Sequence, residues 1–149
     1  MSQLPRVEGP SRPRAETGSG EAGRQGREVA TEATRVEAMK ARDREVRAHE
    51  AAHRAAGGTH VRGGTRLDYQ RGPNGVMYAV GGEVRIDTSP VHGDPEATVE
   101  KARQVRHAAL APRKPSSQDW AVAGRALQMA LQAQAELAAK AGGEGPAKE

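Results

Sequence analysis

The chain has 149 residues, contains no cysteine or phenylalanine, and carries a formal net charge of +4 at pH 7. This length is typical of one domain, and the absence of cysteine excludes a disulfide framework. Leu, Ile, Val and Phe together account for 19 residues. The core must therefore be small, and a bound metal is one way for such a domain to gain folding energy.

The basic balance comes from arginine, with 18 Arg against 5 Lys. Acidic residues are interspersed with them, so we expect an arginine-rich surface and no specific interface for nucleic acid. No segment approaches the roughly 20 apolar residues that span a bilayer, and residues 1–6 lack the apolar region of a secretory signal. We therefore expect a cytoplasmic protein that does not bind membranes.

The N-terminal part of the chain divides into a tail and a helix. Residues 1–27 contain three Pro and five Gly and predict a disordered tail. Residues 28–56 contain neither and are rich in Ala, Glu and Arg, which predicts a long helix that ends at Gly57-Gly58. The apolar stripe of this helix is Val29, Val36, Met39 and Val46.

The middle of the chain predicts antiparallel strands after a short loop or extended piece at 59–64. Residues 65–71 and 76–80 read as two strands, and Gly72-Pro73-Asn74-Gly75 between them is a strong turn signal. Gly81-Gly82 is expected to break or bulge the second strand. Residues 83–87 would then form a further extended segment, so a hairpin or a small meander is predicted.

Two helices are predicted in the C-terminal part. Asp94-Pro95-Glu96 has the N-cap and first-turn residues of a helix that runs to about Leu110. Ser116 and Asp119 have the spacing of a capping box, although Asp replaces the usual Glu, and they open a last helix that ends at Gly142-Gly143. The buried stripe predicted for this last helix is Trp120, Ala123, Leu127, Leu131 and Leu137 or Ala138.

These elements predict an α+β fold with one long helix, a small antiparallel hairpin or meander and two C-terminal helices. The folded domain is expected to span residues 28–141. Residues 142–149 are expected to form a second disordered tail.

Residues 49–53 have the pattern His-Glu-x-x-His on the predicted long helix. Histidines four residues apart lie on the same side of a helix, one turn apart, so both rings can bind one ion. They also continue the apolar stripe of the helix. Glu50 is placed to act on a metal-activated water rather than to bind the metal. The pattern predicts a Zn²⁺ site with His49 and His53 as ligands.

A catalytic zinc site usually needs a third protein ligand. Glu83 is favoured, because Gly81-Gly82 before it would let the backbone approach the metal helix and turn a carboxylate inward. His60, Asp87 and His92 remain alternatives, and the competing interpretation of Glu83 is a surface residue on a strand.

Tyr69 and Tyr78 lie on the two predicted hairpin strands. A tyrosine hydroxyl can stabilise the oxyanion formed during peptide hydrolysis. A tyrosine in a strand is far more often a packing residue, and packing is the interpretation we favour.

Several ordered stretches carry a resemblance to a known family: residues 47–53 with 56–58, 69–75, 78–84, 87–90, 93–98 and 108–112. Together they resemble the SprA-related family of bacterial metalloproteases over about residues 40–135. The resemblance implies a zinc metallopeptidase in which His49 and His53 bind the metal and Glu50 is the catalytic base. Similarity to the family's Gly-Gly-Glu-Val element adds weight to Glu83 as the third ligand.

The leading hypothesis is therefore a zinc-dependent enzyme that hydrolyses peptide bonds of a peptide or protein substrate held near the edge of the hairpin. The alternative is a non-enzymatic interaction module in which the metal stabilises a small core. A nucleic-acid binder is the third possibility, and the sequence lacks the aromatic residues on a basic face that such a protein uses.

Overall fold

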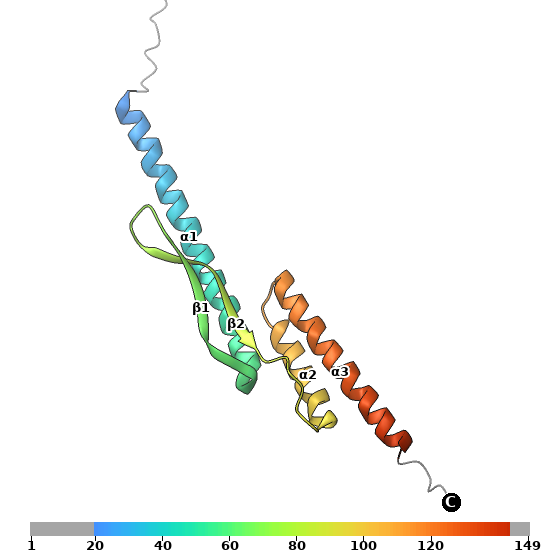
Figure 1. Ribbon diagram of the computed structural model, residues 1–149. Helices are drawn as coiled ribbons and strands as arrows, with labels where there is room; N and C mark the ends of the chain where they lie inside the picture. Colours follow the sequence, from blue (N-terminus) through green and yellow to red (C-terminus); the bar gives the residue numbers. More distant parts are fainter. Residues whose placement is uncertain (1–19, 144–149) are drawn as a thin grey trace, which may run out of the picture.

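The computed structural model describes residues 20–143, and the predicted α+β class is confirmed. In Figure 1 the β hairpin lies along the second half of a long helix, and two further helices form a pair beside it. No helix within residues 20–143 combines the length and apolar character needed to cross a bilayer. The elements in order are α1 (Glu21–Gly57), the short 3-10 turn η1 (Gly58–His60), β1 (Val61–Arg71), β2 (Met77–Ile86), α2 (Pro95–Ala109) and α3 (Ser117–Gly143).

Helix α1 begins at Glu21, earlier than the predicted start at residue 28. Good helix formers around the glycines of residues 21–27 outweigh the roughly 1 kcal/mol that each glycine costs. The rest of the predicted N-terminal tail, residues 1–19, lies outside the described residues, as do residues 144–149 of the predicted C-terminal tail. The helix ends at Gly57 as expected, and Gly58 follows with a φ of 51°.

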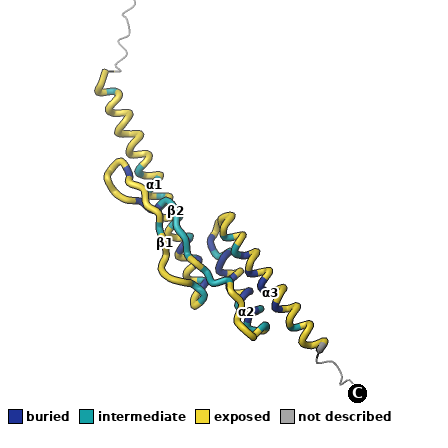
Figure 2. The backbone as a smooth tube through the Cα atoms, in the orientation of Figure 1, coloured by how far each residue is buried: buried dark blue, intermediate teal, exposed yellow. Residues whose placement is uncertain are grey.

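Residues 21–35 of α1 are exposed apart from the half-buried Gly23, whereas the hairpin partly covers the second half of the helix (Figure 2). Val29, a member of the predicted buried stripe, is therefore exposed, because no other described element reaches this part of the helix. Val36, Met39 and Val46 are half-buried. The stripe is correct only where the hairpin covers it.

Strands β1 and β2 form a two-stranded antiparallel hairpin around the predicted turn. Gly75 closes this turn by donating its N–H to the carbonyl of Gly72 at 2.9 Å. Of the break or bulge predicted at Gly81-Gly82, the break does not occur, because both glycines pair with β1, whereas a bulge is present directly before Gly81. The extra residue is Val80, which lies unpaired between the partners of Asp68 and Tyr69. The result is one long bulged strand, so the hairpin is correct and the meander is not.

Side chains of α1 bind the backbone of β2 at this bulge. The Asp43 carboxylate accepts the N–H of Ala79 at 2.7 Å, and Arg42 donates to the carbonyl of Val80 at 2.9 Å. The Ala79 N–H and then the Arg47 guanidinium lower the pKa of the Asp43 carboxyl. These bonds satisfy backbone groups that the irregular strand does not pair, and they fix β2 onto α1.

Gly82 lets β2 lie directly against α1. A Cβ atom at this position would lie 2.8 Å from the carbonyl oxygen of Arg66, 3.0 Å from Cγ of Glu50 and 3.0 Å from Cδ2 of Leu67. The close approach expected of the glycine pair is thus present at Gly82. It places the backbone of β2 in contact with the residue between the two histidines.

Both C-terminal helices begin as predicted. Asp94 caps α2 by accepting the N–H of Ala97 at 3.0 Å. At the start of α3, the Ser116 hydroxyl accepts the N–H of Asp119 at 3.1 Å, and the Asp119 carboxylate accepts the N–H of Ser116 at 2.8 Å. This reciprocal pair is a complete capping box, and it fixes the orientation of the Asp119 side chain.

Helices α2 and α3 pack through small residues. The stripe predicted for α3 is wrong at Trp120, Leu127 and Leu131, whose exposed fractions are 57%, 45% and 55%. Alanines allow the two helix axes to approach closely, and this face is buried in preference to the neighbouring face with larger side chains. The buried residues of the two helices include Ala102, Val105, Ala108, Ala109, Ala123, Ala126, Met129 and Ala133.

Gly82→Ala is expected to destabilise the protein by about 1–3 kcal/mol, because the new methyl group overlaps backbone and Glu50. Gly81→Ala is the matched control: its Cβ would lie 3.5 Å from the nearest atom, Oδ2 of Asp68, and neither glycine has a positive φ. Urea denaturation measures both free energies of unfolding. A Gly82→Ala protein as stable as Gly81→Ala would contradict the close approach.

Candidate metal centre

His49 and His53 lie on the last turns of α1 with their rings close together. Their Nε2 atoms are 3.1 Å apart, and their ring centroids are separated by 4.8 Å at an interplanar angle of 77°. His53 is buried and His49 is half-buried. Both rings lie on the same side of the helix, as their spacing predicts, and point their Nε2 atoms to a common place.

The carboxylate of Asp119 completes this group. Its Oδ2 lies 2.9 Å from Nε2 of His49, and its Oδ1 lies 3.0 Å from Nε2 of His53. One ligand atom from each of the three residues lies within 4.8 Å of the others. The histidines come from α1 and the carboxylate from the first turn of α3, so the group joins two elements far apart in sequence.

The tautomer of His53 follows from its second ring nitrogen. Nδ1 lies 2.9 Å from the carbonyl oxygen of Ala108, which only accepts hydrogen bonds, so Nδ1 carries the proton. In the neutral ring Nε2 then presents a lone pair to the Asp119 carboxylate and to His49. These electron-rich atoms repel one another unless a proton on Nε2 of one histidine, or a cation, lies between them.

The donor set fits a zinc ion. Two imidazole nitrogens and one carboxylate oxygen form one of the ligand combinations of catalytic zinc. A backbone carbonyl that accepts from the second ring nitrogen is also the usual outer partner of a metal-binding histidine. Ala108 supplies that carbonyl to His53 from the end of α2.

Glu50 is buried beside this group, with an exposed fraction of 6%. Its Oε2 is buried and has no hydrogen-bond partner among residues 20–143. Burial raises the pKa of the Glu50 carboxyl; positive charge on His49 or His53 acts in the opposite direction. Glu50 thus has a carboxylate oxygen that can still accept a hydrogen bond in a poorly solvated environment.

Glu83, the predicted third ligand, lies on β2 and lines the same cleft. Its Oε2 is 3.4 Å from a guanidinium nitrogen of Arg66, and its Oε1 is 3.4 Å from Nε2 of Gln118. Its carboxylate is not one of the three converging ligand groups, whose carboxylate comes from Asp119. Metal binding by Glu83 stays a prediction, with Asp119 as its competitor.

The alternative ligands also lie outside the converging group in the part of the chain that the structure describes. His60 places Nε2 at 2.6 Å from Oε1 of Gln104, and His92 is exposed in a loop. Asp87 lines the cleft but binds Arg62 and Lys101 at 2.8 and 2.9 Å. Burial opposes ionisation of Asp87, yet hydrogen bonds from Ser89 and these cations hold its pKa well below the usual range.

Asp119 did not emerge as a ligand from the sequence, where it was identified only as a capping residue. Nothing in the local pattern indicates that the start of α3 returns to the end of α1. The one available signal is the Asp that replaces Glu in the capping box. Its shorter side chain keeps the carboxylate close to the helix axis while still accepting the N–H of Ser116.

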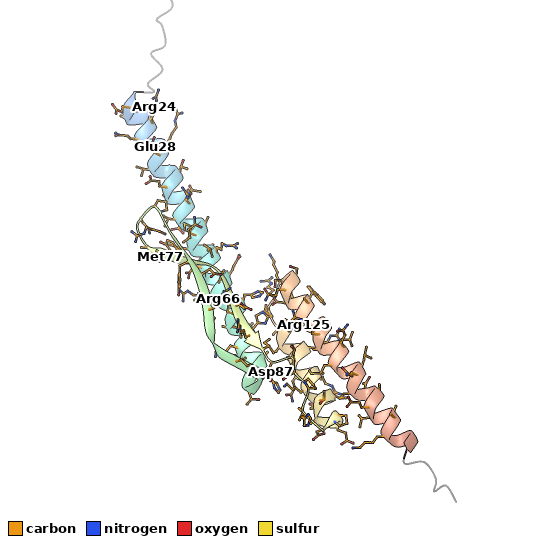
Figure 3. All side chains as sticks on the ribbon, in the orientation of Figure 1. Arg24, Glu28, Arg66, Met77, Asp87 and Arg125 are labelled. Carbon is orange, nitrogen blue, oxygen red and sulfur yellow. The ribbon has the colours of Figure 1, made fainter. Side chains whose placement is uncertain are left out.

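The three ligand candidates and Glu50 line a cleft of about 1280 Å³. Its walls are α1, the second half of β2 with the residues that follow, and the start of α3; Figure 3 labels Asp87 and Arg125 at two sides of this region. Neither tyrosine lines it. Tyr78 is buried and accepts a hydrogen bond from Asn74 at 2.7 Å, so the packing interpretation of this residue is correct. Tyr69 is half exposed.

The chain matches the model of a known protein family. A model of the SprA-related family matches residues 14–143, which include every element from α1 to α3 and all residues of the candidate centre. No curated protein and no solved structure matches the chain.

Asp119→Asn tests which carboxylate binds the metal. The amide oxygen can still cap α3, but the charge is lost, so zinc affinity should fall by at least the roughly 10–100-fold that loss of an outer partner costs. Glu83→Gln is expected to leave zinc affinity unchanged. Isothermal titration with zinc measures both, and circular dichroism checks helix content. The reverse result would establish Glu83 as the third ligand.

Proposed function

The chain belongs to the SprA-related family, and from the geometry of its centre we propose that it is a zinc-dependent peptidase. The observation that carries the proposal is the convergence of two imidazole nitrogens and one carboxylate beside a buried, unpartnered Glu50. A histidine pair and a carboxylate hold zinc, and a nearby glutamate is the usual general base of such a site.

His49, His53 and Asp119 are the proposed ligands. The carbonyl of Ala108 holds the His53 ring in one orientation, and the Ser116 N–H does the same for Asp119. When bound, zinc would supply Lewis-acid polarisation of a water molecule and of the scissile carbonyl. These outer hydrogen bonds orient the two side chains toward the proposed ion.

Glu50 is the proposed general base and acid. Its Oε2 accepts a proton from the attacking water and later gives it to the leaving amine. Burial supports the first step, because it raises the carboxyl pKa and so makes the carboxylate a better proton acceptor. Gly82 holds β2 against the Glu50 side chain and shields it from solvent.

The outer edge of β2 is the proposed binding place for the substrate backbone. Within residues 20–143 the sheet contains β1 and β2 alone, so β2 pairs with a strand on one side only. Residues 80–86 of β2 line the cleft next to the histidines. An extended peptide can add to such an edge through main-chain hydrogen bonds, which suits a protease that must hold a backbone carbonyl.

A second candidate function is a metal-stabilised interaction module without catalysis. It is favoured by the position of the proposed ligands, because α1 packs mainly on β2 and less on α2, whereas α3 packs mainly on α2. An ion between the histidines of α1 and Asp119 of α3 would join these two parts. The buried α2–α3 seam is mostly alanine, which contributes little apolar area, so such a link would matter for stability.

Glu50→Gln is expected to lower the rate of peptide hydrolysis by about 10²–10⁴-fold, because the general base is lost. Zinc affinity should stay the same. Glu32→Gln is the matched control on the same helix, since Glu32 is exposed and does not line the cleft. Turnover of fluorogenic peptide pools by the zinc-loaded protein measures the effect. Undiminished hydrolysis by Glu50→Gln would exclude the mechanism.

Removal of metal by a chelator tests the structural role. The melting temperature should fall in the wild type, since an ion present at about 100 times its dissociation constant stabilises the fold by about 2.7 kcal/mol. The melting temperature of Asp119→Asn should respond much less. Calorimetry with and without chelator measures both. An unchanged melting temperature of the wild type would contradict the link between α1 and α3.

A further inference from the structure

We propose that this cleft selects acidic peptides, with Asp or Glu side chains near the scissile bond. This inference rests on the proposed peptidase function and names its substrate class. It rests on the charged side chains that line the cleft and on which of them form ion pairs within the protein. The positively charged residues concerned lie on the α3 side and on β2.

Apart from Arg42, whose guanidinium binds the carbonyl of Val80, four exposed cationic residues line the cleft without an acidic partner. They are Arg85 on β2, Arg113 and Lys114 between α2 and α3, and Arg125 on α3. Among the described residues, none of the four forms an ion pair. Their charges are therefore available to a bound molecule.

The acidic residues of the cleft are in contrast mostly engaged. Asp87 binds Arg62 and Lys101, Glu83 lies beside Arg66, and Asp119 faces the two histidines. Glu50 is buried. The exposed acidic residue of the lining that has no cationic partner among residues 20–143 is Glu45. The uncompensated charge in the cleft is thus positive, which raises the local concentration of anionic ligands.

The cations lie where side chains of a substrate would reach. Arg113 and Lys114 immediately precede the capping box that holds Asp119, and Arg125 follows Asp119 by six residues, or about 9 Å along the helix. A peptide added to the edge of β2 would lie between β2 and this cationic wall. Figure 3 labels Arg125 on the first turns of α3. Arginine binds carboxylates in a bidentate manner, so it favours Asp and Glu over neutral residues.

Acidic peptide is a better fit than nucleic acid, although both are anionic. Single-stranded nucleic acid is held by aromatic stacking as well as by charge. Neither tyrosine nor Trp120 lines the cleft, and the carboxylate of Glu45, which has no cationic partner among residues 20–143, would repel a continuous phosphate backbone. Isolated acidic side chains between uncharged residues avoid this repulsion.

The test separates binding from turnover. The zinc-loaded Glu50→Gln protein is titrated with a fluorescent extended peptide rich in Glu and with the same peptide carrying Gln at those positions. Fluorescence anisotropy should give about tenfold tighter binding of the Glu peptide, and added salt should reduce the difference. Combining Arg113→Gln, Lys114→Gln and Arg125→Gln should remove the preference.

The matched control combines Arg24→Gln, Arg27→Gln and Arg35→Gln, which changes net charge equally on the exposed first half of α1, away from the cleft. This control should keep the preference for the Glu peptide. Equal affinities for the two peptides, or loss of the preference in the control, would overturn the inference. An unlabelled single-stranded oligonucleotide that displaces the Glu peptide more effectively than unlabelled Glu peptide would also overturn it.

Hydrolysis by the wild-type protein distinguishes this inference from the proposed function. Cleavage of the Glu and Gln peptides with equal kcat/KM would overturn acidic selection and leave the peptidase proposal in place. Tight binding of the Glu peptide without cleavage by the wild type would do the opposite, supporting acidic recognition and contradicting the peptidase.

Discussion

The position of one carboxylate determines how the candidate centre is assembled. Asp119 closes the capping box of α3 through the N–H of Ser116, and the same carboxylate faces the Nε2 atoms of His49 and His53. A capping residue is held by backbone geometry and has little rotational freedom. The start of α3 therefore holds this carboxylate rigidly, and the docking of α3 on α2 decides whether the carboxylate meets the two imidazoles.

Local signals in the sequence predict most of the elements. The capping residues at Asp94 and Ser116 and the turn at 72–75 correctly place two helix starts and the hairpin, because backbone chemistry near each position decides them. The predictions are wrong where tertiary packing determines which side chains are buried. Val29 is exposed because the hairpin does not reach it. The stripe of α3 was assigned to its largest apolar residues, whereas the alanine face is the one that α2 covers.

The candidate site likewise contains residues that the local sequence predicts and one that only tertiary packing brings in. His49, Glu50 and His53 belong to one helical turn, so their spacing alone brings them together. Asp119 joins them only through the path of α2 and α3, which no local pattern encodes. Glu83 was inferred from its glycines, and Gly82 does permit the close approach expected there. That approach places the backbone of β2 against Glu50, whereas the Glu83 carboxylate lies beside Arg66 and Gln118.

The alanine seam between α2 and α3 has a further consequence. It joins α3 to α2, and α2 in turn contacts the end of α1: Ala108 of α2 accepts the hydrogen bond from His53, and its Cβ lies 3.8 Å from the position that a Cβ on Gly57 would occupy. The seam therefore works as a spacer that sets how far the start of α3 stands from the end of α1. Bulkier side chains at Ala123 or Ala126 would widen this spacer and move the Asp119 carboxylate relative to the histidines. Small side chains in the seam thus help to determine how far apart the three donor groups lie.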